Sequence, residues 1–378
     1  MNQSPLELLP PGADVETRTI LKQLNNANKK LAELKGVART IPNEEILIQT
    51  LTLQEARESS RIENIVTTQD DLYRAGLEFP DERVNPATKE VMRYGEAMRR
   101  GFRAVRENKL LTNNIIQEIQ RELEDNSAGF RSTMGTVLKN QFGETVYTPP
   151  QDAEEVIRLM SNLERYVNVP ELHDVDPLIK LAIIHYQFES IHPFYDGNGR
   201  TGRIMCILYL VINGLLDLPI LYLSRYITKN KSQYYKYLQE IRESGGSGEA
   251  WEQWIIYMLK GIEVTAAETI ELVQKIACLM KEYKRILKER ASKMYSHDLL
   301  NCLFYSPYTK IEHLESHLGI SRPTAAKYLD EMVRLELLKK EKIWRRNYYI
   351  NAGLVAILAH TDVEEIDSAE LVRTAEKG

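Results

Sequence analysis

The sequence lacks the features that define exported, membrane-spanning and disulfide-bonded proteins. Its 378 residues include 3 cysteines, Cys206, Cys278 and Cys302, at spacings that fit neither a disulfide framework nor a cysteine metal cluster. The long apolar tract 204–223 is interrupted by Asn, Gly, Asp and Pro, so it does not fit a membrane span. The first residues lack the basic and apolar pattern of a signal peptide. We therefore expect a cytoplasmic protein with no membrane contact.

The sequence also lacks a strong excess of charge of either sign. It has 49 Lys and Arg residues, 54 Asp and Glu residues and a net charge of -5, and 43% of its residues are hydrophobic. Binding of a polyanion by the whole surface is therefore excluded, and any contact with nucleic acid must be local. A chain of this length exceeds one comfortable hydrophobic core, so two or three domains are expected.

Hydrophobic periodicity predicts a mainly α-helical fold. Apolar residues recur at helical spacing in the segments 14–34, 42–64, 87–107, 112–124, 151–166, 177–190, 232–243 and 251–293. Between two of these segments, Gly129, Gly135 and Gly143 punctuate a stretch that closes at Pro149 and Pro150. This stretch predicts a small β-hairpin flap.

The C-terminal part of the chain predicts a separate winged helix-turn-helix domain. Two helical segments, 299–304 and 310–318, precede Gly319 and a helix that runs from Ser321 to position 338, and two short strands around a basic turn follow. Ser321 is in position to cap the third helix. Basic residues slightly exceed acidic residues between 309 and 350, which leaves DNA binding and protein contact both open.

Residues 192–203 combine the parts of a nucleotide-handling site in the order His-Pro-Phe-Tyr-Asp-Gly-Asn-Gly-Arg-Thr-Gly-Arg. A glycine turn followed by an apolar tract predicts a helix N-terminus, whose N–H groups bind phosphate. His192 is a candidate general base, and Asp196 is a candidate magnesium ligand. Main-chain N–H groups and guanidiniums would neutralise phosphate charge, and they come from Gly197, Asn198, Gly199, Arg200 and Arg203. Phosphoryl or nucleotidyl transfer is the reaction class indicated.

The same twelve residues resemble the Fic family motif, His-x-Phe-x-Asp/Glu-Gly-Asn-Gly-Arg-x-x-Arg, and match it at every specified position. The resemblance implies a helical core that transfers AMP from ATP to a Tyr, Ser or Thr hydroxyl of a target protein and releases pyrophosphate. It implies that His192 deprotonates the hydroxyl, that Asp196 holds Mg²⁺ and that the flap aligns the target. The residues expected to contact ATP are Glu63, His192, Gly197, Asn198, Gly199, Arg200, Thr201, Gly202, Arg203 and Tyr235.

A second segment, Ser59-Ser60-Arg61-Ile62-Glu63-Asn64, resembles the inhibitory motif Ser/Thr-x-x-x-Glu-Gly/Asn that precedes some Fic cores. Ser59 and Glu63 share a helix face, which is also the pattern of simple surface pairing. The resemblance implies that Glu63 pairs with Arg203 and misaligns ATP, so that the enzyme is held inactive. In some relatives this glutamate also assists removal of AMP, so both directions of reaction stay open.

The resemblance also implies a division of the chain and a homodimer. We expect an N-terminal helical region that carries the inhibitory motif, a Fic core, a connecting helix, a winged helix domain and an acidic tail. Their respective ranges are 1–109, 110–260, 261–294, 295–360 and 361–378.

Two alternative functions compete with AMP transfer. Some family members use other phosphate donors or phosphorylate their targets, although the intact Gly-Asn-Gly turn favours AMP transfer here. The second alternative is a transcription regulator that binds DNA through the winged helix and uses the Fic core as a nucleotide sensor. Its expected DNA contacts are Arg322, Thr324, Lys327 and Tyr328 in the recognition helix and Arg345 and Arg346 in the wing.

Overall fold

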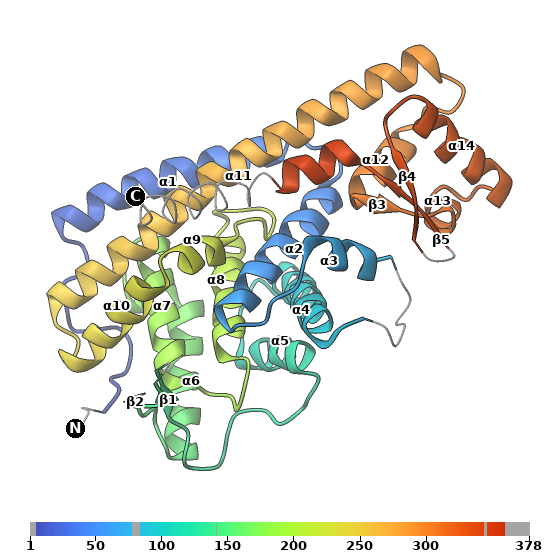
Figure 1. Cartoon of the computed structure of the whole chain (residues 1–378). Coiled ribbons are helices and arrows are strands. Elements are labelled where there is room, and N and C mark those ends of the chain that lie inside the picture. The colour runs from blue at the N-terminus through green and yellow to red at the C-terminus, as the bar shows by residue number, and fades with distance from the viewer. Residues whose placement is uncertain (1–4, 78–83, 141, 344–345, 360–378) are drawn as a thin grey trace, which may run out of the picture. The chain divides into compact units, whose positions relative to one another are not determined.

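The protein is predominantly helical, as the periodicity predicts (Figure 1). A computed structural model describes residues 5–77, 84–140, 142–343 and 346–359. The chain forms two compact units: unit 1 comprises Met1–Gly36, Leu51–Val66 and Lys89–Thr269, and unit 2 comprises Val37–Thr50, Thr67–Thr88 and Ile270–Gly378. Within the described ranges, no helix is both long and apolar enough to cross a membrane.

Unit 1 is a set of packed helices, four of which are divided between the two units. The helices that contribute to it are α1 (Arg18–Ala38), α2 (Glu44–Ile62), α4 (Pro86–Asn108), α5 (Asn113–Glu124), α6 (Ala153–Asn168), α7 (Pro177–Ile191), α8 (Asn198–Ile212), α9 (Leu223–Lys229), α10 (Lys231–Glu243) and α11 (Gly248–Arg290). The divided helices are α1, α2, α4 and α11.

The centre of unit 1 is formed by α7 and α8, which pack against each other (Figure 1). Every residue of α7 from Leu178 to Ile191 is buried, as expected for a helix that is apolar on all sides. Asp176 caps its start by accepting a hydrogen bond from the N–H group of Leu178 at 2.8 Å. The segment 192–197, which we call the motif loop, joins these two rigid helices.

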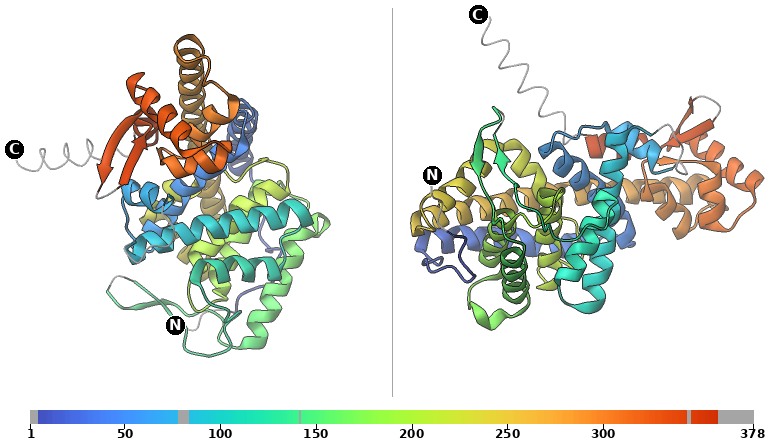
Figure 2. Two further views of the ribbon diagram at one scale, coloured as in Figure 1. Left: turned by 90° about the vertical axis from the view of Figure 1, so that its right-hand side faces the viewer. Right: turned by 90° about the horizontal axis from the view of Figure 1, so that it is seen from below.

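The glycine-punctuated stretch forms the predicted hairpin at the margin of unit 1 (Figure 2). Its strands are β1 (Leu138–Lys139) and β2 (Thr145–Tyr147), which pair antiparallel. Gly143 has a φ of 80°, a left-handed conformation that favours glycine in the connecting turn. With so few ladder bonds, the hairpin depends on side-chain contacts with the helices for its position.

Unit 2 contains the C-terminal helices and a small sheet. Its elements are α3 (Gln69–Ala75), α12 (His297–Tyr305), β3 (Tyr308–Thr309), α13 (Ile311–Leu318), α14 (Arg322–Arg334), β4 (Lys339–Ile343) and β5 (Arg346–Ile350). The three strands form an antiparallel sheet in the order β3-β5-β4. Gly319, with a φ of 63°, ends α13 and turns the chain toward α14.

The sequence prediction for this region needs several corrections. The helix α14 ends at Arg334 and not near position 338, and the strand β3 was not predicted. Ser321 occupies the N-cap position, but its hydroxyl lies 2.9 Å from the Thr324 hydroxyl and makes no capping bond to the backbone. In other parts of the sequence, the short helices α3 and α9 were also not predicted, because 7 residues are too few to show a helical period.

Candidate functional site

The motif loop is held rigidly between α7 and α8. His192 ends α7 in a left-handed conformation, with φ 49° and ψ 60°, and its N–H group donates to the carbonyl of Phe188 at 2.9 Å. The buried Phe194 ring packs against Phe130 and Phe188. The Asn198 amide bridges both the N–H and the carbonyl of Phe194, each at 2.8 Å. The sequence prediction placed Asn198 against ATP, whereas its side chain in this structure fixes the loop.

His192 has the properties of a proton acceptor. Its Nδ1 atom is buried and has no hydrogen-bond partner among the described residues. Burial, together with the guanidiniums of Arg242 and Arg131, lowers the pKa of His192 to about 4. The imidazole is therefore neutral at neutral pH, which is the state that a general base requires.

The first turn of α8 presents main-chain N–H groups at the end of the motif loop. Gly197 is the N-cap residue, with a φ of 77° that favours glycine. The Asp196 carboxylate accepts a hydrogen bond from the Gly197 N–H group at 2.7 Å. A Cβ atom at Gly199 would lie 2.4 Å from an oxygen of Glu63, so a larger residue there would have to displace that carboxylate. A helix N-terminus of this kind binds anions.

Two residues of the predicted ATP-contacting set are turned toward the protein interior. The Thr201 side chain is fully buried, and its N–H group donates to the carbonyl of Gly197 at 2.9 Å. A Cβ atom at Gly202 would lie 2.9 Å from an oxygen of Glu189 and 3.0 Å from Phe188, so this glycine allows α8 to approach α7 closely. The small size of Thr201 and Gly202 therefore has a packing role.

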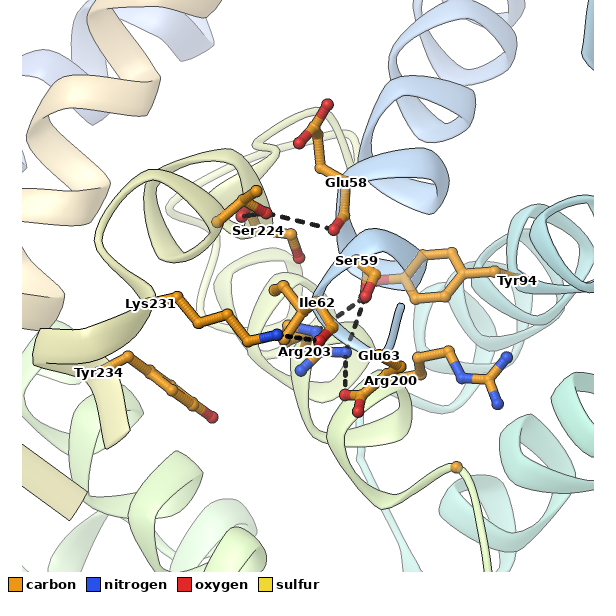
Figure 3. Close-up of polar contacts among 12 residues, drawn as sticks. Glu58, Ser59, Ile62, Glu63, Tyr94, Arg200, Arg203, Ser224, Lys231 and Tyr234 are labelled. Atoms are coloured by element: carbon orange, nitrogen blue, oxygen red, sulfur yellow. Dashed lines mark hydrogen bonds and ion pairs between the residues drawn. The ribbon is translucent and has the colours of Figure 1, made fainter. Parts of the chain in front are cut away.

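The two segments that the sequence analysis singled out meet at Arg203 (Figure 3). The Arg203 guanidinium donates to the Ser59 hydroxyl at 2.7 Å, to the Ser59 carbonyl at 3.1 Å and to the Glu63 carboxylate at 2.8 Å. Arg203 is 2% exposed, whereas the Glu63 side chain is 37% exposed. Burial tends to raise the pKa of Glu63, but the attraction of the Arg203 guanidinium outweighs it and lowers that pKa. The carboxylate is therefore charged, and the Glu63–Arg203 pair forms as predicted.

Arg200 is engaged by a separate pair of carboxylates, which could not be identified from the sequence. It donates to Glu124 at 2.7 Å and to Glu90 at 3.2 Å, and it is 4% exposed. Burial raises the pKa of Glu124 and Arg200 opposes that rise. The two motif arginines thus belong to different networks, although they lie three residues apart on one helix.

The end of α2 explains why asparagine follows Glu63. Asn64 has a φ of 64°, and the N–H group of Ile65 donates back to the carbonyl of Ser60 at 3.0 Å, which closes the helix. Asparagine and glycine tolerate this left-handed conformation better than other residues. The Lys231 ammonium adds a bond of 2.6 Å to the carbonyl of Ile62 (Figure 3). The backbone that carries Glu63 is therefore fixed at both of its ends.

The buried carboxyl group of Glu55, which lies earlier on α2, also fixes this helix in place. Glu55 accepts bonds from the Ser224 N–H group at 3.1 Å, from the Tyr94 hydroxyl at 3.1 Å and from the Ser224 hydroxyl. Burial raises the pKa of Glu55 to about 8. Glu55 was missed by sequence reasoning, because a glutamate on an amphipathic helix is normally a surface residue.

The hairpin stretch is tied to the motif loop by Arg131, which sequence reasoning also missed. The Arg131 guanidinium donates to the carbonyls of His192 at 2.8 Å and Ile191 at 3.2 Å, and also to the carbonyl of Pro150. The Arg131 N–H group donates to the carbonyl of Pro193 at 2.8 Å. One buried side chain thus connects the beginning and the end of the flap stretch to the backbone of His192.

The adjacent pair Tyr234 and Tyr235 divides into a core residue and a surface residue. Tyr234 is 2% exposed and its hydroxyl lies 2.9 Å from His185 Nε2. Tyr235 is 48% exposed. Only the second ring is accessible to a ligand, which agrees with the choice of Tyr235 from the sequence.

One of the residues expected to contact DNA is already paired within its own domain. Arg322 is held by two acidic residues of α13, with bonds of 2.8 Å to Glu312 and 3.4 Å to Glu315. Arg345 lies outside the described residues, as does the tail from 361 to 378. A phosphate contact by Arg322 would have to displace two carboxylates of its own domain.

Three family models match the chain. Fic/DOC family N-terminal matches residues 21–103, Fic/DOC family matches residues 110–210, and the C-terminal domain of the protein adenylyltransferase SoFic-like matches residues 279–354. These matches include residues 59–64, the motif loop and the C-terminal helices. The chain therefore has segments similar to the Fic N-terminal, Fic and SoFic-like C-terminal domains.

Individual relatives agree with this assignment at modest identity. Protein adenylyltransferase Fic of Drosophila erecta is 29% identical over 142 residues, which is 36% of this chain and 28% of that protein. A probable protein adenylyltransferase of Aquifex aeolicus is 28% identical over 199 residues, covering 52% of this chain and 54% of that one. The chain thus spans about half or less of the length of these relatives. A Fic family protein from Desulfovibrio desulfuricans shares the fold, with a TM-score of 0.56, 20% identity and coverage of 90% and 98%.

Proposed function

We propose that the protein is an adenylyltransferase that transfers AMP from ATP to a Tyr, Ser or Thr hydroxyl of a target protein. The observation that carries this proposal is the neutral, half-buried imidazole of His192 beside the N-terminus of α8. His192 removes the hydroxyl proton, and the oxygen attacks the α-phosphorus of ATP. The bond to the β-phosphate oxygen breaks, and pyrophosphate leaves.

The remaining motif residues bind and orient the nucleotide in this proposal. Main-chain N–H groups at Gly197 to Gly199 hold phosphate oxygens, and the accessible Tyr235 ring covers the nucleoside. Arg203 would take a phosphate oxygen once Glu63 withdraws. Arg131 fixes the backbone of His192, so the base stays in register with the target hydroxyl.

A magnesium ion fits the donor set at the end of the motif loop. Asp196 is exposed. Glu124 lies against the neighbouring Gly197, because a Cβ atom at Gly197 would be 2.4 Å from a Glu124 oxygen. Hard carboxylate oxygens together with phosphate oxygens are the ligands that Mg²⁺ prefers. Asp196 would hold the ion, which supplies charge neutralisation on the phosphates when bound.

We propose further that Glu63 keeps the enzyme inactive. The Glu63–Arg203 pair occupies the guanidinium that would otherwise hold the nucleotide's terminal phosphate. ATP bound in this state has its α-phosphate displaced from the line of attack, which lowers the rate of transfer. The same carboxylate would assist removal of AMP from a modified protein, so hydrolysis belongs to this proposal as a second activity.

Other predictions from the sequence remain part of the proposal. They are the homodimer, the cytoplasmic location and the division into an N-terminal region, Fic core, connecting helix, winged helix domain and acidic tail. DNA contact through the C-terminal domain also stays a prediction. As a main function it is not favoured, because the family model that matches the C-terminal domain itself carries the name of a protein adenylyltransferase and Arg322 is already paired.

Separately labelled ATP tests the proposed reaction. Purified wild type, Glu63→Gln and the double variant Glu63→Gln with His192→Ala are incubated with Mg²⁺ and ATP labelled at either the α- or the γ-phosphate. We expect α-label on protein with Glu63→Gln and none with the double variant. Incorporation of γ-label without α-label would show a kinase and contradict the proposal. The matched control Glu45→Gln changes an exposed glutamate of the same helix and should behave as wild type.

A further inference from the structure

A cluster of metal-ligating side chains lies in unit 2, apart from the residues of the proposed active site. Cys302 comes from α12, and His313 and His317 come from α13. One donor atom from each residue lies within 4.8 Å of the other two. The sequence analysis considered only the spacing of the cysteines, so it missed the His-x-x-x-His pattern on a helix. Histidines four residues apart on a helix share one face.

The surroundings of the two imidazoles orient them. His317 Nδ1 lies 3.0 Å from the His313 carbonyl and can only donate to it, so His317 Nε2 carries the lone pair that binds a metal. The Thr309 hydroxyl lies 3.4 Å from His313 Nδ1. The ring centroids of the two histidines are 4.2 Å apart, and the Tyr305 ring packs beside both. A backbone or side-chain partner on the second ring nitrogen is the usual arrangement around metal-binding histidines.

We propose that Cys302, His313 and His317 form a binding site for a divalent transition-metal ion of the Zn²⁺ type. One thiolate and two imidazoles are the mixed sulfur and nitrogen ligands that Zn²⁺ prefers, and they exclude Mg²⁺ and Ca²⁺. Three protein ligands leave a fourth position for water or an outside ligand. The thiol proton of Cys302 passes to solvent when the ion binds.

The geometry needs only a small adjustment to close around an ion. Zn–N and Zn–S bonds of about 2.0–2.3 Å place tetrahedral ligand atoms about 3.5 Å apart. The ligand atoms of the three residues lie within 4.8 Å of one another, so these distances have to shorten by about 1 Å, which side-chain rotation can provide. Cys302 is buried and His317 is exposed, so the ion can enter from the His317 side. Once bound, it would cross-link α12 to α13 and stabilise the C-terminal domain.

Cobalt titration of the full chain tests this site. The protein is freed of metal with a chelator under reducing conditions and titrated with Co²⁺, a spectroscopic substitute for Zn²⁺. We expect a thiolate-to-cobalt charge-transfer band, d–d bands of tetrahedral intensity, and displacement of both by Zn²⁺. Cys302→Ser should remove the charge-transfer band. His317→Gln changes an exposed residue and should weaken Co²⁺ binding at least about tenfold without unfolding the chain.

The matched control is Cys278→Ser, because Cys278 is an exposed cysteine outside the cluster. This control should keep the wild-type spectrum and affinity, and Zn²⁺ should raise its Tm as it does for wild type but not for His317→Gln. Absence of a charge-transfer band in wild type would overturn the proposal. The same conclusion would follow if the band persisted in Cys302→Ser or disappeared in Cys278→Ser. None of these readouts depends on AMP transfer.

Discussion

Replacement of Glu63 by glutamine should release the proposed transferase activity. The size of the expected increase in rate follows from the energy of the Glu63–Arg203 pair. Exposed ion pairs contribute about 0.2–1 kcal/mol, whereas breaking a buried pair costs about 3–5 kcal/mol. Here Arg203 is 2% exposed and the Glu63 side chain 37% exposed, so solvent screens one partner only. We therefore take about 2 kcal/mol for the bias toward the inhibited arrangement, which corresponds to about 30-fold in rate.

The assay compares initial rates of α-label incorporation for wild type and Glu63→Gln at the same ATP and Mg²⁺ concentrations. Glutamine keeps the length of the side chain and removes its charge, and Ser59 still accepts two bonds from Arg203. A rise of about tenfold to a hundredfold is expected, which corresponds to about 1.4–2.7 kcal/mol around the bias of about 2 kcal/mol. Rates within twofold of each other would refute the reasoning, because the pair would then exert no restraint on catalysis.

Three other perturbations test separate parts of the site. Because the pKa of His192 is lowered to about 4, the acid limb of kcat/KM in Glu63→Gln should fall well below pH 6.5. The folded state also binds fewer protons than the unfolded state, so stability should decrease as pH falls from about 6.5 toward 4. Arg131→Lys replaces the planar guanidinium with a single ammonium nitrogen that cannot reproduce the separate Nε and Nη2 contacts, so it should lower kcat about tenfold to a hundredfold with little change in KM for ATP, while the exposed control Arg158→Lys should change neither. Glu55 has a folded-state pKa raised from 4.5 to about 8, so its contribution to stability is fully present below about pH 4.5 and is lost as pH rises from there through 8; Glu55→Gln should reduce that fall in Tm between pH 4.5 and 8, and an unchanged fall would contradict the assignment.

The sequence predicted the long helices and the motif loop because both leave strong local signals. Apolar periodicity predicted helices over 112–124 and 177–190, and each boundary lies within one residue of those of α5 and α7. The Gly197 turn and the following apolar tract located the N-terminus of α8. The Glu63–Arg203 pair came from the family resemblance, since residues 140 positions apart give no local signal of contact.

The interactions that the sequence could not predict are buried polar contacts between distant segments. Arg131 bonds to carbonyls about sixty residues away, and carbonyl groups are identical at every position of a sequence. Glu55 meets Ser224 169 positions away, and Arg200 meets Glu90 110 positions away. Arg200 and Arg203 were both predicted to bind phosphate, because the sequence does not show which carboxylates the fold places beside each of them.

Intact-protein mass spectrometry tests the central claim most directly. The Glu63→Gln protein is incubated with unlabelled ATP and Mg²⁺, alone and with a cell lysate, and modified residues are located by peptide sequencing. The account predicts that Tyr, Ser or Thr side chains gain the mass of one AMP group, and that adding His192→Ala removes this product. A gain of one phosphoryl group, or an AMP product that persists without His192, would contradict it.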